Sequence, residues 1–175
     1  MAMEDAVPRL VRWTLAAEPD WDEVYAEALP KVYNFFRYRI GDRPEVDDLT
    51  SLTFEKAWRA RQRYRRDVAG FGTWVMTIAR NVAIDYFRTR RPDAPLEDAD
   101  GHEATVTPED AAARRSDARR LAALMAALDG RERDLLSLKF GAGMTNRAIA
   151  QMTGLSESNV GTIVHRAIDT LRRGW

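Results

Sequence analysis

Hydrophobic residues recur every three or four positions along most of this 175-residue chain. That spacing places them on one face of an α-helix, whereas the residues of a half-buried strand would alternate. In 71–91 the apolar face is formed by Phe71, Val75, Ile78, Val82 and Tyr86. The same spacing predicts helices at 21–40, 45–58, 108–128, 131–140 and 146–152, and another after Ser156. We therefore predict an all-α fold.

Three positions within these helices carry further expectations. Pro30 interrupts the pattern of 21–40, so it predicts either a bend or a boundary between two helices. Trp58 falls on the predicted core-facing side of 45–58, and Leu121 falls on that of 108–128. We expect both side chains to be buried.

The C-terminal part of the chain predicts a helix-turn-helix. Thr145 can cap the short helix 146–152, and Ser156 can cap the longer helix that follows. Gly154 lies between them, and glycine is suited to the left-handed conformation at a helix end. This pattern is typical of DNA-binding domains, in which the second helix enters the major groove. A helical hairpin with a purely structural role is the alternative.

Within the second helix, Val160, Ile163, Val164, Ala167 and Leu171 form the predicted buried face. The residues off that face are the candidates for DNA contact. With nearby arginines, they are Arg147, Ser158, Gly161, Thr162, His165, Arg166 and Arg172. The arginines suit phosphates, and the early residues of the helix suit base edges.

The segment 92–112 divides the chain. It contains proline, glycine and many acids with little apolar periodicity, which is the composition of a flexible linker. We therefore predict a tail at 1–20, a first helical domain at 21–91, an acidic linker at 92–112, and a helix-turn-helix domain at 113–175.

The formal net charge is zero, but the charges are segregated. Residues 56–91 hold ten Lys or Arg against two acids, whereas 92–113 hold seven acids and no Lys or Arg. The arginines flank aromatic residues at the start of helix 71–91, a combination that suits phosphate contacts and base stacking. The candidates are Arg65, Arg66, Phe71, Trp74, Arg80, Asn81, Arg88 and Arg91. A merely solvated basic surface is the alternative.

The composition also bounds the chemistry. There is no cysteine, and the two histidines, His102 and His165, are far apart in the sequence, so we expect no metal site, no cofactor and no catalytic residue. No apolar run is long enough to cross a membrane. We expect a cytoplasmic protein without membrane insertion that is not an enzyme.

A second exposed face belongs to helix 45–58. It carries Asp48, Ser51, Leu52 and Glu55. A solvated acidic face is one interpretation. The isolated Leu52 among polar residues favours another, a docking surface for a protein partner.

Three blocks of sequence, in this order, carry a resemblance to a known family. They are DDLTSLTFEKAW, FGTWVMTIARNVAIDYFRTRR and LDGRERDLLSLKFGAGMTNRAIAQMTGLSESNVGTIVHRAIDTLRR. The arrangement resembles the extracytoplasmic-function (ECF, group IV) sigma factors of bacterial RNA polymerase. The resemblance implies that 21–91 opens and reads the minus-10 promoter element. It implies that the C-terminal domain reads the minus-35 element as duplex.

The resemblance also implies partners and roles. Helix 48–58 would bind the clamp helices of the largest polymerase subunit, the loop 65–71 would capture a flipped base, and Asn81 would take part in minus-10 recognition. Further implied partners are the flap of the second-largest subunit, promoter DNA and an anti-sigma factor.

The chain departs from the family pattern at several positions. Ser51 and Leu52 stand where Gln-Glu is common, Gly72 replaces an arginine or aromatic residue, and Gly161 and Ile163 stand where basic residues are frequent. Fewer cations in the recognition helix predict a weaker or altered grip on the minus-35 element. The alternative function is a two-domain helix-turn-helix regulator that acts without binding polymerase.

Overall fold

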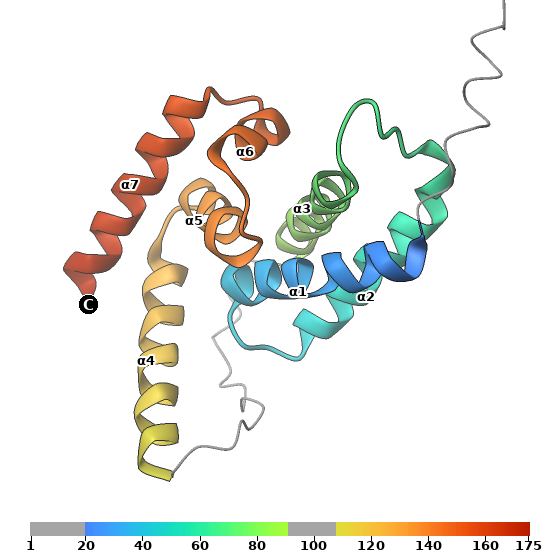
Figure 1. Cartoon of the computed structure of the whole chain (residues 1–175). Coiled ribbons are helices and arrows are strands. Elements are labelled where there is room, and N and C mark those ends of the chain that lie inside the picture. Colours follow the sequence, from blue (N-terminus) through green and yellow to red (C-terminus); the bar gives the residue numbers. More distant parts are fainter. Residues whose placement is uncertain (1–19, 91–107) are drawn as a thin grey trace, which may run out of the picture.

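The computed structural model describes residues 20–90 and 108–175, and every regular element in these ranges is helical (Figure 1). The all-α prediction is confirmed. The N-terminal domain holds α1 (Trp21–Ile40), α2 (Glu45–Ala60), the 3-10 turn η2 (Arg61–Arg63) and α3 (Phe71–Thr89). The C-terminal domain holds α4 (Pro108–Ala127), α5 (Gly130–Leu136), the π-helical turn η3 (Ser137–Gly141), α6 (Asn146–Thr153) and α7 (Glu157–Gly174).

The first helix begins and ends where local chemistry dictates. The Asp20 carboxylate accepts a hydrogen bond from the Asp22 backbone N–H at 3.0 Å, which satisfies a donor that has no partner within the helix. One helix then continues through Pro30 to Ile40. The prediction that Pro30 could mark a boundary is wrong, since this residue lies on the exposed side while Ala28 and Val32 hold the chain against the core.

The apolar faces of α1, α2 and α3 pack against one another. Val75 and Val82 are buried as predicted, and Phe71, Ile78 and Tyr86 are partly buried at the edge of the same core. Trp58 is 51% exposed, so the prediction that it is buried is wrong. It lies in the last turn of α2 next to Ala57, which is buried, and its own ring packs edge-to-face on the Trp21 ring instead.

The C-terminal domain follows the same logic. Asp129 caps α5 by accepting from the backbone N–H groups of Arg131 and Glu132, both at 2.8 Å. Leu135, Leu136 and Leu138 are buried. Leu121 is 38% exposed, which contradicts its predicted burial, whereas Met125 and Leu128, one and two turns later on the same face of α4, are buried.

The helix-turn-helix is present in α6 and α7. The Thr145 hydroxyl accepts from the Ala148 N–H at 3.2 Å, and the Ser156 hydroxyl accepts from the Asn159 N–H at the same distance. Between the helices, Gly154 has a φ of 74°, in the left-handed region. Both capping predictions and the glycine turn are confirmed.

The two domains lie against each other (Figure 1). The turn η3 and helix α5 pack on α1, and the buried residues of both domains form one continuous apolar core. At Gly141 the approach is so close that an added Cβ would lie 2.8 Å from the backbone oxygen of Asn34. The sequence left the relative position of the domains open, and the structure has them closed together.

Residues 1–19 of the predicted tail 1–20, residue 91 and residues 92–107 of the predicted linker 92–112 lie outside the described residues, whereas 108–112 form the start of α4. Among the described helices, none combines the length and the apolar character that crossing a bilayer requires.

Candidate nucleic-acid interface

Aromatic side chains from α1, α2, α3 and the loop between α2 and α3 meet at the start of α3. We call Trp21, Trp58, Tyr64, Phe71 and Trp74 the aromatic cluster. The ring centroids of Trp21 and Phe71 lie 5.3 Å apart, those of Trp21 and Trp58 5.5 Å, and those of Tyr64 and Trp74 5.1 Å. These distances and the edge-to-face or tilted geometries are typical of stabilising aromatic pairs. The cluster anchors the loop after α2 to the first turn of α3.

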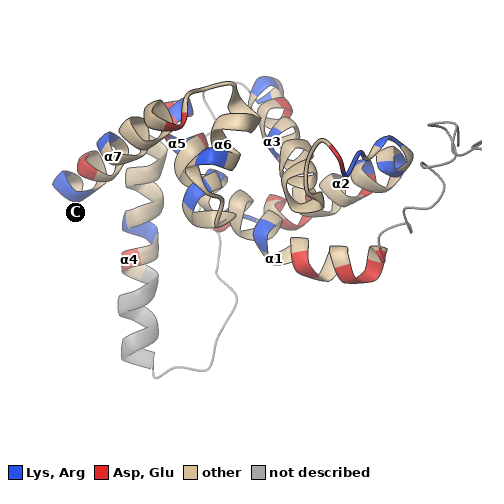
Figure 2. Cartoon of the chain, turned by 45° about the horizontal axis from the view of Figure 1, so that its top comes forward, with Lys and Arg blue, Asp and Glu red and all other residues tan. Residues whose placement is uncertain are grey.

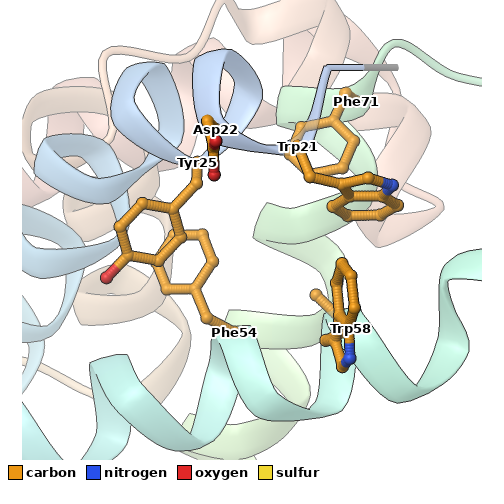
Figure 3. Close-up of a pocket in the computed structure, with 7 residues that line it drawn as sticks. Trp21, Asp22, Tyr25, Phe54, Trp58 and Phe71 are labelled. Carbon is orange, nitrogen blue, oxygen red and sulfur yellow. The ribbon is translucent and has the colours of Figure 1, made fainter. Parts of the chain in front are cut away.

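An open cavity of about 240 Å³ lies beside this cluster (Figure 3). Its wall is mostly aromatic, and Tyr25 packs on Phe54 with ring centroids 4.4 Å apart. The lining residues are Trp21, Asp22, Tyr25, Phe54, Ala57, Trp58 and Phe71. The half-exposed rings of Tyr25 and Trp58 give it flat apolar surfaces that an aromatic or aliphatic group can contact.

Basic residues gather at the end of α2 (Figure 2), in the stretch of chain that also carries Trp58 and Tyr64. The Arg61 guanidinium lies 4.1 Å from the centre of the Trp58 ring and donates to the Trp58 carbonyl at 2.8 Å. Arg65 pairs with Asp67 at 2.7 Å, and this hydrogen bond lowers the pKa of the Asp67 carboxyl. Arg66 is exposed. The loop thus presents positive charge beside aromatic faces, the combination found in sites for single-stranded nucleic acid.

The outer face of α3 is less uniform than its sequence suggests. Asn81 and Arg88 are exposed, with Arg88 held 3.0 Å from Asp85. Arg80 instead turns toward the C-terminal domain, where its Nε donates to Asp134 at 2.6 Å, and its side chain is 27% exposed. The last residue of the predicted basic face, Arg91, lies outside the described residues.

The four predicted docking residues of α2 come together on one exposed face. Asp48, Ser51, Leu52 and Glu55 follow the spacing of adjacent helical turns, and all four are exposed. Leu52, 38% exposed, is an apolar spot between carboxylates, and Glu55 pairs with Arg59 at 2.5 Å. The face is suited to a partner that presents a small apolar side chain and positive charge.

The candidate residues of the C-terminal domain gather along α7. Ser158, Thr162, His165 and Arg166 are exposed, and Gly161 is half-buried beside Asn146. Val160, Val164 and Ala167 form the opposite, buried side, as predicted. Arg147 and Arg172 are exposed at the two ends of this surface, Arg147 from α6 at 3.7 Å from Glu157 and Arg172 from α7 at 3.7 Å from Asp169. The arrangement places polar side chains and cations along one face of a helix that could enter a groove.

Two charged residues that the sequence did not single out are buried between the domains. Arg39 of α1 is 9% exposed, with its guanidinium 4.5 Å from the centre of the Phe87 ring. Its Nε lies 3.8 Å from Asp134, which is 6% exposed. Burial lowers the pKa of Arg39 to about 10, in spite of the attraction of Asp134. No local pattern reveals this pairing, because the partners are far apart in the sequence.

Two family models match the chain. Sigma-70 region 2 matches residues 24–92, and Sigma-70 region 4 matches residues 124–173. The first match contains α2, α3 and most of α1 with the loop between α2 and α3, and the second contains α5 to α7 almost entirely. Apart from Trp21 and Asp22, the residues of each candidate surface described above lie within one of these regions.

Individual relatives agree with the family models. The ECF RNA polymerase sigma factor BldN of Streptomyces coelicolor is 30% identical over 168 residues, which cover 94% of this chain and 64% of the relative. The chain therefore spans somewhat less than two thirds of that relative's length.

Solved structures are also similar. That of CnrH, in complex with the cytosolic domain of CnrY, has a TM-score of 0.59 and 26% identity, covering 85% of this chain and 80% of CnrH. The sigma factor RpoE of Bartonella quintana, in complex with the anti-sigma factor NepR, has a TM-score of 0.69 and 19% identity. That match covers 89% of this chain and 96% of RpoE, and it supports the fold alone.

The two domains, their surfaces and their relatives agree on one assignment. The chain belongs to the sigma-70 family, as an ECF sigma factor.

Proposed function

We propose that this protein, as a group IV sigma factor, binds core RNA polymerase through α2, opens and reads the minus-10 element with α3 and the aromatic cluster, and reads the minus-35 element with α7. The observation that carries the proposal is the presence, in one chain, of a cation-flanked aromatic cluster and a separate helix-turn-helix. A helix-turn-helix regulator needs the second feature but has no use for the first.

The polymerase contact falls to the exposed face of α2. Its carboxylates, Asp48 and Glu55, suit basic residues on the clamp helices of the largest subunit. Leu52 stands between them where many family members have an acid. We therefore assign a larger share of the binding energy to its apolar contact, because a side chain at the centre of an interface loses most of its water.

Strand separation is the task of the N-terminal domain. Unstacking a base costs free energy, and stacking it on an aromatic ring returns about 1–3 kcal/mol. The half-exposed rings at the cavity, with Arg61, Arg65 and Arg66 nearby for phosphates, support this role. Asn81, exposed on α3, can hydrogen-bond a base edge, and Arg88 suits the backbone. Phe71 and Trp74 contribute by holding the loop in position as well as by contact.

The minus-35 contact falls to α7. Ser158, Thr162 and His165 lie one helical turn apart and would face base edges, whereas Arg147, Arg166 and Arg172 would contact phosphates. Gly161 leaves this face without a side chain at its centre. The C-terminal domain would also meet the flap of the second-largest polymerase subunit, which is an implication of the family.

We also propose an anti-sigma factor as a regulatory partner and the cytoplasm as the place of action. CnrH, with which this chain shares 26% identity, was solved with a bound protein domain, and this supports a comparable partner here. The proposed role requires no catalytic residue in this chain, because polymerase carries out the chemistry.

The test combines the purified protein with core polymerase in run-off transcription on a genomic library. We expect initiation at discrete promoters only when both are present. Leu52→Asp should weaken core binding at least about tenfold, because it places a charge in the apolar contact. Leu121→Asp is the matched control, since Leu121 is equally exposed but lies on α4. Sequence-specific duplex binding by the free protein without any association with polymerase would refute the proposal.

A further inference from the structure

A carboxylate from the C-terminal domain is buried against two arginines of the N-terminal domain. Asp134 of α5 accepts from the Arg80 Nε at 2.6 Å through one oxygen, and its other oxygen lies 3.8 Å from the Arg39 Nε. That second oxygen and the Arg39 Nε have no hydrogen-bond partner among the described residues. One anion therefore faces two cations in a site that is largely shielded from water.

The backbone next to this site makes the contact between the domains tight. An added Cβ at Gly141 would lie 2.8 Å from the Asn34 backbone oxygen and 3.0 Å from the Phe35 Cα. Both neighbours belong to the backbone of α1 and cannot rotate away as a side chain could. The three atoms nearest to such a Cβ all belong to α1, so it is the closed arrangement of the domains that requires glycine at position 141.

The same contact occupies Arg80, which the sequence predicts as a candidate for DNA contact. Arg80 cannot donate its Nε to a phosphate while Asp134 accepts it, and the carboxylate cancels the positive charge that would attract the phosphate. The neighbouring Asn81 stays exposed. Closure thus withdraws one cation from the minus-10 surface.

In the closed arrangement the protein is also too short to contact both promoter elements at the same time. Elements centred about 25 base pairs apart are separated by roughly 85 Å along straight duplex DNA. A compact chain of this length spans only about 40 Å. In the structure α6 packs beside α3 and against α7, so α3 and α7, the two helices assigned to DNA, belong to one compact body.

We propose that the free protein is held closed by an interdomain latch, made of Asp134, Arg39, Arg80 and Gly141, and that the latch must open before both promoter elements are bound. The inference rests on the proposed function for its consequence in transcription, whereas the closure itself rests on the contacts alone. Binding of core polymerase favours the open state, because the two DNA-reading surfaces must separate to reach both promoter elements at the same time. In this state Arg80 is available to DNA.

The first test measures closure directly. The chain has no cysteine, so Ala26→Cys on α1 and Gln151→Cys on α6, both exposed positions, can carry a fluorescent donor and acceptor. We expect high energy transfer in the otherwise unmodified protein and a decrease when core polymerase is added. Low transfer in the free protein would overturn the proposal without any further variant.

The second test opens the latch by two independent routes. Asp134→Asn removes the anion at nearly constant shape, and Gly141→Ala forces the backbones apart. Each should lower energy transfer and tighten binding of a fluorescent 20-mer of deoxythymidine, about tenfold if one molecule in ten is open at rest. Asp117→Asn, an exposed change of the same charge on α4, and Gly130→Ala, where an added Cβ meets nothing within 4 Å, are the controls.

Unchanged transfer and affinity in both latch variants would refute the latch. Equal effects of Asp117→Asn and Asp134→Asn would mean that only net charge matters, which also refutes it. Run-off transcription with core polymerase then separates the two proposals: variants that open but never support initiation contradict the sigma-factor role, not the latch.

Discussion

At the scale of single residues, neighbours in the sequence have different surroundings and therefore different roles. Arg80 and Asn81 are adjacent on α3, yet Arg80 is bound by Asp134 while Asn81 faces solvent. Trp74 is partly buried and packs on Tyr64, Phe71 and Trp21. A substitution at Trp74 consequently changes the fold and the site together, whereas one at Asn81 changes the site.

The first prediction separates these two effects. Asn81→Ala should leave the free energy of unfolding within about 0.5 kcal/mol of the wild type, because the side chain is exposed. It should reduce promoter opening about tenfold, the value of one lost base contact. Denaturant unfolding measures the first quantity, and permanganate footprinting of the melted strand with the holoenzyme measures the second.

Trp74→Ala is the companion variant. It should lower the free energy of unfolding by roughly 3 kcal/mol, since a large ring leaves the packed aromatic cluster. If Asn81→Ala destabilised the protein as strongly as Trp74→Ala, its proposed role in DNA reading would lose its support.

At the scale of elements, the ends of the helices are set by local chemistry. Asp20, Asp129, Thr145 and Ser156 each accept a backbone N–H at a helix start, and Gly154 turns the chain between α6 and α7. Signals of this kind involve residues two to four positions apart, so the sequence alone reveals them. Burial of single side chains was harder to predict: Trp58 and Leu121 follow the apolar spacing but are exposed, although Ala57 beside Trp58 and Met125 one turn after Leu121 are buried.

The second prediction concerns the turn of the helix-turn-helix. Gly154→Ala should destabilise the C-terminal domain by about 1–2 kcal/mol, because a residue with a Cβ is strained at a φ of 74°. No atom lies within 4 Å of the added Cβ, so the cost is conformational and not steric. Thermal unfolding measures it. Gly130→Ala, within a helix, is the control and should be neutral or slightly stabilising, and equal losses from both would contradict this account.

At the scale of the whole molecule, the two domains share one apolar core. Buried residues of α1 and η3 belong to the same packed cluster, with the Asp134 latch at its edge. Domains joined in this way are expected to unfold together, whereas domains without a shared core unfold independently.

The third prediction follows from this shared core. Unfolding of the wild type in urea should give the same midpoint by tryptophan fluorescence and by circular dichroism. Gly141→Ala should separate the two midpoints, because the aromatic cluster with three tryptophans reports mainly the N-terminal domain. Distinct midpoints in the wild type would show that the shared core does not couple the domains.

The sequence by itself determined the helical fold, most helix ends, the helix-turn-helix and the exposed candidate faces of α2 and α7. All of these depend on residues within a few positions of one another, where periodicity and capping act. Tertiary structure alone decided that Arg80 faces Asp134, that Arg39 is buried and that Gly141 lies on the backbone of α1. Arg80 and Asp134 are 54 positions apart, and no local pattern can indicate which distant charge a folded chain will bring to an arginine.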